Sequence, residues 1–309
     1  MSRGPLTALG AGLAVFAAIA LLQARADRSG EAPGAAGETM RGTAGVREFW
    51  AAYREATAHR MAGRVVDARD AYRKALALNA VHEDALYYLG NMELELGEYA
   101  GAEAAWRRLI EVNPVSARAH SRLGDLYACM DSGAPHDLGR AEAEFRRALE
   151  INREETGPLL RLGEIALIRG DLIGAEGFLN AVIGSHAKSV EAHFLKGYAA
   201  WKRAQPERAS TFLRDAVALA HSVRIISAVP SEGDTKRGLV PAAVKSSRCR
   251  LFEAEIEQLS SLDSTTVATR TDEVYQELDR RLAQIPLRRN SQTSRARTPR
   301  RDVLRAGEQ

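Results

Sequence analysis

The middle of the chain repeats itself about every 34 residues, and this period constrains the fold more than any other feature. A column of alanines recurs with spacings of 34, 39, 34 and 34, at Ala68, Ala102, Ala141, Ala175 and Ala209. Four residues after each alanine stands a large apolar residue: Tyr72, Trp106, Phe145, Leu179 or Leu213. A fixed period of this length indicates a stack of supersecondary units rather than one globular core.

A second column marks a helix that precedes each alanine. It consists of the pairs Leu89-Gly90, Leu123-Gly124, Leu162-Gly163 and Lys196-Gly197. Gly63, Gly97 and Gly170 lie five residues before an alanine of the first column, where a tight turn is needed. Each unit is therefore predicted to be two antiparallel helices. We expect the glycine of the first helix and the alanine of the second to lie where the two backbones approach most closely, so that larger side chains would overpack.

These columns resemble the tetratricopeptide repeat (TPR) family, in which Leu-Gly, a turn glycine, alanine, an aromatic residue and a closing proline such as Pro114 recur. The resemblance covers residues 49–223 as five units: 49–82, 83–116, 117–155, 156–189 and 190–223. It implies an all-α, right-handed superhelical solenoid with a concave face. The first unit departs from the pattern with Glu55 and Ala56, and the fifth with Lys196, as expected of end units that cap a stack.

The third unit is five residues longer than the others, and the extra length falls between Tyr127 and Ala141. Gly133, Pro135 and Asp137 place it in the turn between the two helices. It is predicted to be either a surface loop without a role or a contact element, because long loops often carry function.

By analogy with the family, the first helix of each unit lines a groove that suits an extended or helical peptide. The residues predicted to contact a protein partner there are Trp50, Tyr53, Tyr87, Asn91, Arg118, Arg122, Asp125, Arg161, Glu164, Phe194, Tyr198 and Trp201. Some residues of the groove are expected to belong to the core between units instead. The family's clamp for a terminal carboxylate is not predicted, because Tyr53, Thr57 and Tyr88 stand where it needs Lys and Asn. Arg118, Arg122 and Arg161 are candidates for binding an acidic partner segment.

Residues 6–22 form a 17-residue stretch without a charged residue, and Arg3 precedes it. Ala24 and Ala26 supply a site of the kind at which secretory signals are cut, so residues 1–26 are predicted to be a cleaved signal or an uncleaved membrane anchor. A buried helix of the folded domain is the weaker alternative, because no amphipathic period is visible. Either main interpretation exports the chain to the periplasm or another extracytoplasmic space. Residues 27–48, rich in Gly and Ala, are predicted to be a flexible linker.

Beyond the repeats, residues 224–248 are predicted to be a linker and residues 249–286 a helical region. Apolar residues at helical spacing predict helices over 249–262 and 271–285, which either cap the last repeat or form a dimerising hairpin. Residues 287–309 carry seven Arg and two acidic residues and are predicted to be a disordered basic tail. The tail is either solvated without a partner or attracted to anionic lipid or an acidic protein.

No motif for catalysis, a cofactor or a metal is present: the sequence contains no H-E-x-x-H, C-x-x-C, G-x-S-x-G or P-loop pattern. The net charge of +3 does not call for nucleic acid. Cys129 and Cys249 could pair in an oxidising compartment, although nothing in the sequence brings them together. The predicted function is therefore an exported, non-enzymatic scaffold that binds a partner peptide or helix and supports assembly of a complex. The alternative is binding of an anionic membrane or polyanion through the tail, with the repeats as a spacer.

Overall fold

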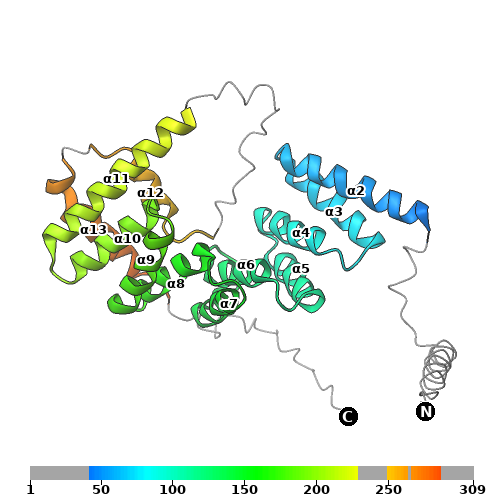
Figure 1. The fold of residues 1–309 in the computed structure, drawn as a ribbon, viewed down its shortest axis with the longest axis horizontal. Helices are drawn as coiled ribbons and strands as arrows, with labels where there is room; N and C mark the ends of the chain where they lie inside the picture. The colour runs from blue at the N-terminus through cyan, green and yellow to red at the C-terminus, as the bar shows by residue number, and fades with distance from the viewer. Residues whose placement is uncertain (1–41, 229–248, 264–265, 287–309) are drawn as a thin grey trace, which may run out of the picture.

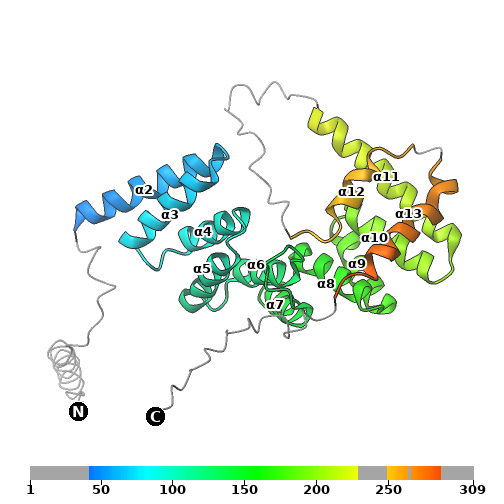
Figure 2. The same ribbon diagram turned by 180° about the vertical axis from the view of Figure 1, so that it is seen from behind.

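The computed structural model describes residues 42–228, 249–263 and 266–286, and these residues form helices without a strand. Five antiparallel pairs follow one another along a curved stack (Figures 1 and 2). The pairs are α2 (Thr43–Met61) with α3 (Val65–Leu78), α4 (Glu83–Glu95) with α5 (Tyr99–Val112), α6 (Ala117–Ala128) with α7 (Leu138–Ile151), α8 (Thr156–Ile168) with α9 (Leu172–Ser185), and α10 (Val190–Lys202) with α11 (Pro206–Ala228). The prediction of an all-α solenoid of helix pairs is confirmed.

Two of the predicted boundaries differ from those of the helices. The first helix begins at Thr43, within the segment predicted to be a linker, and its N-cap is Gly42. The last repeat helix continues to Ala228, past the predicted end of the fifth unit at residue 223. Residues 1–41, most of the predicted linker 224–248 and the basic tail lie outside the described residues. No helix in the described part of the chain is both long and apolar enough to cross a membrane.

The connection within each unit contains a residue with a left-handed backbone, and it is a glycine in four of the five units, including Gly133 at φ 90° in the longer loop of the third. Gly63, Gly97 and Gly170 have φ of 71°, 76° and 77°. In the fifth unit Ala204, which also lies five residues before the alanine of the first column, adopts the same conformation at φ 55°. A side chain with a Cβ is strained there by about 1–2 kcal/mol.

The close approach predicted at the Leu-Gly column is present, but the nearest neighbour of the glycine varies. In the second, third and fourth units it is the large residue four positions after the alanine, whereas a Cβ added to Gly197 would meet the Tyr275 side chain and, at 3.2 Å, the carbonyl oxygen of Ala209 in the alanine column. A Cβ added to Gly124 would stand 2.6 Å from the Phe145 ring, and one added to Gly163 would stand 3.1 Å from Leu179. The alanine column is nevertheless fully buried in every unit. The predicted close approach, at which a larger side chain would overpack, is therefore present, and in three units the large residue of the second helix rather than the alanine makes the nearest contact.

Two further helices cover the end of the stack: α12 (Glu253–Leu259) and α13 (Val267–Leu282) lie against α10 and α11 (Figure 1). Phe252, Leu259, Tyr275 and Leu278 are buried in the same core as the last repeats. The capping interpretation is confirmed. α12 is shorter than the predicted range 249–262 because residues 249–252 do not join it, and α13 begins at Val267, four residues before the predicted start at 271.

The extended loop of the third unit is a contact element, and its partner is the C-terminal region of the same chain. Cys129, at the end of α6, forms a disulfide with Cys249, 120 residues further along. His136 bridges two backbone carbonyls, with Nδ1 3.1 Å from that of Cys129 and Nε2 2.9 Å from that of Pro286. The cap thus starts and ends at this loop, which ties the fifth unit back to the third.

Candidate protein-binding groove

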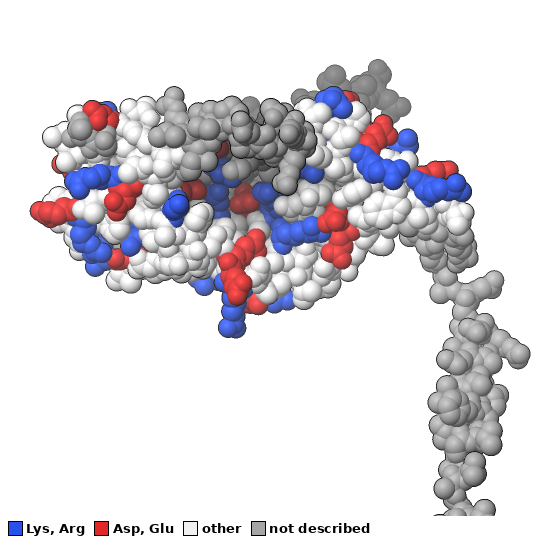
Figure 3. All heavy atoms as spheres, turned by 45° about the horizontal axis from the view of Figure 1, so that its top comes forward, with Lys and Arg blue, Asp and Glu red and all other residues white. Residues whose placement is uncertain are grey.

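A pocket of about 240 Å³ opens where the first helices of the second, third and fourth units face one another. The charged or polar residues that line it are Tyr87, Arg118, Ser121, Arg122, Asp125, Glu155, Arg161 and Arg250. Figure 3 shows Lys/Arg and Asp/Glu side chains gathered around a hollow in the middle of this face. The helix repeat produces this convergence, because corresponding positions of consecutive first helices lie side by side.

Tyr87 on α4 is the aromatic centre of the pocket. The guanidinium carbons of Arg118 and Arg122 lie 4.8 Å and 5.9 Å from its ring centroid. Nε of Arg122 donates a hydrogen bond of 3.3 Å to the Tyr87 hydroxyl. Stacked cations hold the ring in place while each keeps donors free for another acceptor.

Two of the pocket arginines form ion pairs with neighbouring acids. Arg118 lies 2.6 Å from Asp84, and Arg122 lies 3.3 Å from Asp125. Burial alone would lower the pKa of Arg122, but Asp125 and Tyr87 outweigh it, so that the pKa is raised. Burial raises the pKa of the Glu155 carboxyl, although Ser121 and Arg122 oppose the shift.

Arg161 and Glu164 were predicted to contact a partner, but the structure turns them largely inward. Arg161 lies 2.5 Å from Glu164, 3.4 Å from Glu191 and 3.5 Å from Asp125. Glu164 has no exposed surface, and burial together with Glu191 raises its pKa despite Arg161. These side chains join the fourth unit to its neighbours. Glu164 is corrected to a core residue, and Arg161 lines the pocket with a side chain that is only 13% exposed.

The first unit presents a group of aromatic rings, as predicted. The Trp50 and Tyr53 rings lie 5.8 Å apart, and both contact the ring of His82. Trp50 is 44% exposed, so it is available to a partner. Burial, together with Asp84, raises the pKa of Tyr53 to about 12. Asn91 is half-buried, and its side-chain oxygen has no hydrogen-bond donor among the described residues.

Two of the three predicted aromatic residues of the fifth unit, Phe194 and Tyr198, are buried, which corrects another part of the prediction, whereas Trp201 is half-buried. Phe194 and Tyr198 are 1% and 2% exposed because α13 covers them. The Tyr198 hydroxyl donates a 2.6 Å hydrogen bond to Asp279, and Nε1 of Trp201 donates a 2.8 Å hydrogen bond to Asp272. The chain's own cap therefore occupies the end of the groove where these three residues lie.

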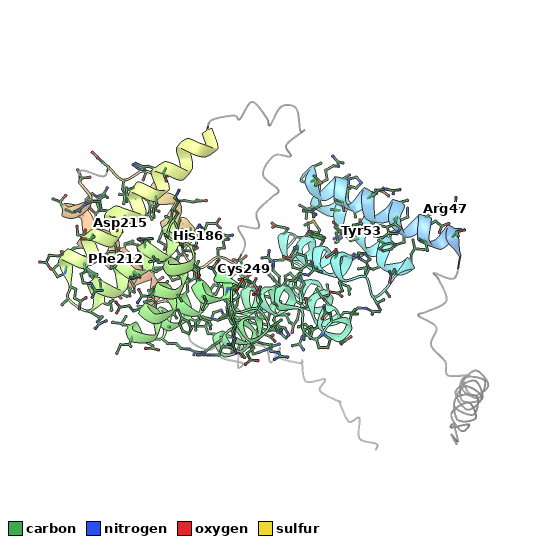
Figure 4. All side chains as sticks on the ribbon, in the orientation of Figure 1. Arg47, Tyr53, His186, Phe212, Asp215 and Cys249 are labelled. Carbon is green, nitrogen blue, oxygen red and sulfur yellow. A yellow bond between two sulfur atoms is a disulfide. The ribbon has the colours of Figure 1, made fainter. Side chains whose placement is uncertain are left out.

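Sequence reasoning missed the contribution of Cys249 and Arg250 to the pocket wall. These residues come from the C-terminal region, and Cys249 lies close to α6 and α8 (Figure 4). The only available signal was the presence of two cysteines. Among the described residues, Cys129, Asp131 and Cys249 place possible metal-ligand atoms within 4.8 Å of one another. The disulfide uses both sulfur atoms, so this group does not offer thiolates to a metal.

Helix pairs at a 34-residue period, stacked around a concave pocket, define an α-solenoid repeat protein. A tetratricopeptide repeat model matches residues 53–106 and 93–129 of the sequence. This match identifies tetratricopeptide repeats over residues 53–129, and the helix pairs continue the same architecture to Ala228.

Several solved structures are similar in fold. The crystal structure of MamA is 17% identical and covers 60% of this chain and 99% of that one, with a TM-score of 0.49. YrrB, described as a TPR protein with an unusual peptide-binding site, is 20% identical and covers 60% and 93%, with a TM-score of 0.45. TTC0263, a thermophilic TPR protein of Thermus thermophilus, is 18% identical and covers 62% and 96%, with a TM-score of 0.44. No curated protein matches the sequence.

Proposed function

We propose that this protein is an exported scaffold that binds an acidic segment of a partner protein in the pocket between its second, third and fourth units. It acts by binding rather than by catalysis and brings its partner into a complex. The observation that carries the proposal is the convergence of four arginines and Tyr87 on one concave pocket whose lining includes only two acidic residues, Asp125 and Glu155.

The composition of the pocket wall supports an acidic peptide over an apolar helix. Guanidinium groups donate paired hydrogen bonds to carboxylates, and an aromatic ring beside them packs against the aliphatic part of a Glu or Asp residue. Arg118 remains 38% exposed in its side chain despite its ion pair with Asp84. An incoming carboxylate would share Arg118 and Arg122 with Asp84 and Asp125 and would extend an existing charge network.

Trp50 and Tyr53 extend this surface toward the first unit. Both lie on α2, and partly exposed aromatic residues are frequent anchors of protein interfaces. The fifth unit is not part of the proposed surface, because α13 already covers it. The proposal therefore places the partner on the N-terminal part of the groove.

The disulfide between Cys129 and Cys249 supports export, because disulfides persist in oxidising compartments and are rare in the cytosol. The uncharged stretch of residues 6–22 supports the same proposal. Whether that stretch is removed or remains as a membrane tether is a second question, which the mass of the mature protein's N-terminal peptide answers directly.

Fluorescence anisotropy with a labelled peptide of consecutive glutamates tests the proposal, with a glutamine peptide of equal length as the control. We expect saturable binding of the glutamate peptide alone. Arg122→Ala should weaken binding about tenfold, as expected for loss of a charge-assisted hydrogen bond. Arg214→Ala, at an exposed site on α11 outside the pocket, should not change it. Equal binding of both peptides, or equal loss in both variants, would contradict the proposal.

A further inference from the structure

The pocket is assembled from two parts of the chain that are far apart in sequence. The second unit supplies Tyr87, the third unit Arg118 and Arg122, and the fourth unit Arg161, whereas the segment that leads into the cap supplies Cys249 and Arg250. Cys249 is 120 residues from its disulfide partner Cys129. The part of the pocket wall formed by Cys249 and Arg250 therefore depends on the contacts that hold this segment against the repeats.

Arg250 differs from the other three arginines in its contacts. Arg118, Arg122 and Arg161 each form at least one ion pair with an acid of the repeats. Arg250 is exposed and makes no hydrogen bond or ion pair with a described residue; Glu253 is the acid on which it acts electrostatically. Among the four arginines of the pocket, Arg250 is therefore the one whose guanidinium N–H groups make no hydrogen bond with a described residue. All of them can donate to a ligand.

Two constraints fix the backbone on either side of Arg250. On the C-terminal side, Leu251 and Phe252 are buried, and the Leu251 carbonyl accepts a 2.8 Å hydrogen bond from Arg281. On the N-terminal side, the disulfide holds Cys249, whose backbone is in the left-handed region at φ 66°. A non-glycine residue in this region is disfavoured, so Cys249 should leave it once the disulfide is broken.

The cap is also held by contacts that do not involve the disulfide. Tyr275 is buried against the fifth unit, and Asp279 accepts hydrogen bonds from Tyr198 and Lys202 at 2.6 Å and 2.8 Å. We therefore expect that breaking the disulfide releases residues 249 and 250 while α13 stays in place.

We propose that the Cys129–Cys249 disulfide completes the binding pocket by fixing Arg250 at its wall, so that the oxidised protein binds acidic segments more tightly than the reduced protein. This inference rests on the proposed function and adds a redox requirement to it. Reduction transfers two electrons and two protons from an external dithiol to the disulfide and yields two thiols and the oxidised dithiol. Cys249 then relaxes, and Arg250 keeps only the constraint on its C-terminal side, at Leu251 and Phe252, which does not fix its position at the pocket wall.

The test uses the full chain and the labelled glutamate peptide. Arg250→Ala should weaken binding of the oxidised protein about tenfold, whereas Arg214→Ala should leave it unchanged. Dithiothreitol, and separately the double variant Cys129→Ser/Cys249→Ser, should produce a loss of similar size. Reduction should cause little further loss in the Arg250→Ala protein, because both changes remove the same contact.

Circular dichroism at the assay temperature verifies that each protein remains helical, and hydrogen exchange of α13 verifies that the cap stays docked. Unchanged affinity in Arg250→Ala or after reduction, with Arg122→Ala still impaired, would overturn the redox inference and leave the proposed function intact. Tighter binding after reduction would also overturn it and would instead make residues 249–250 a lid. Absence of any binding to the oxidised wild type would overturn the proposed function as well.

Discussion

The Tyr198 hydroxyl on α10 donates a 2.6 Å hydrogen bond to Asp279 on α13, which joins the last repeat to the cap that covers it. Lys202 donates a second bond to the same carboxylate at 2.8 Å. A residue that family analogy assigns to the partner groove thus contacts the chain's own helix. At the C-terminal end of the solenoid, the groove therefore binds a helix of the same chain. At the N-terminal end, the groove is proposed to bind a partner.

The hydrogen bonds from Lys202 and Tyr198 hold the pKa of Asp279 below its ordinary value of 3.8. A carboxyl group with a depressed pKa in the folded state stabilises the protein above its ordinary pKa, and this contribution is lost as the pH falls through the folded-state value. We therefore expect Asp279→Asn to lower the melting temperature at neutral pH, and the difference from wild type to shrink at a pH below 3.8. Thermal unfolding followed by circular dichroism measures both. A difference that does not depend on pH would show that the Asp279 charge is irrelevant.

Ala204 is strained at φ 55°, in the turn where three other units use glycine. Ala204→Gly should stabilise the protein by roughly 0.5–1 kcal/mol, because relief of about 1–2 kcal/mol of strain exceeds the entropic cost of glycine. The reverse change, Gly97→Ala, places a Cβ at φ 76° and should destabilise the protein. Urea unfolding of both variants tests the pair, and a destabilised Ala204→Gly protein would refute the assignment of strain.

Two helical glycines provide a matched test of the packing of the Leu-Gly column. A Cβ at Gly124 would meet the Phe145 ring at 2.6 Å, so Gly124→Ala should cost about 1–3 kcal/mol. Gly177 on α9 has no described atom within 4 Å of such a Cβ, so Gly177→Ala should stabilise the protein by about 0.5–1 kcal/mol through helix propensity. Free energies of unfolding should therefore change with opposite signs. Equal effects would mean that close packing does not explain the glycine column.

The sequence was sufficient for the architecture because the determinants of the repeat are local. Each unit repeats the same alanine, large residue and glycine at fixed offsets, so its two helices can be read without knowledge of the rest of the chain. The failures concern contacts between distant segments. Phe194 and Tyr198 were assigned to a partner because nothing in their own unit reveals α13, which lies about 80 residues further along. Neither Arg250 nor the Cys129–Cys249 pair could be placed for the same reason.

Glu164 illustrates a second limit of family analogy. Its repeat position was assigned to the groove, but Arg161 and Glu191 surround it in a buried charge network. Position in a repeat specifies the face of the helix and not the depth of burial, which depends on the side chains of adjacent units. Tyr87 and Arg122 do line the pocket, because their neighbours leave it open.

Tyr87 and Trp201 should separate binding from stability. Tyr87 lies beside the pocket arginines, so Tyr87→Ala should weaken binding of the glutamate peptide. Trp201 donates a hydrogen bond to Asp272 of the cap and does not line the pocket. We expect Trp201→Ala to lower the melting temperature without changing peptide affinity. Anisotropy titrations and thermal melts of both variants provide the comparison, and loss of affinity in Trp201→Ala would extend the binding surface to the fifth unit.

The central claim is that the partner occupies the pocket between the second, third and fourth units. Photo-crosslinking in cells tests it most directly, with a photoreactive amino acid at Ser121 in the pocket or at Ile173, which is 78% exposed and lies outside the pocket. We predict a crosslinked partner peptide rich in Asp or Glu from position 121 and none from position 173. No adduct at position 121, or the same adduct from both positions, would contradict the account.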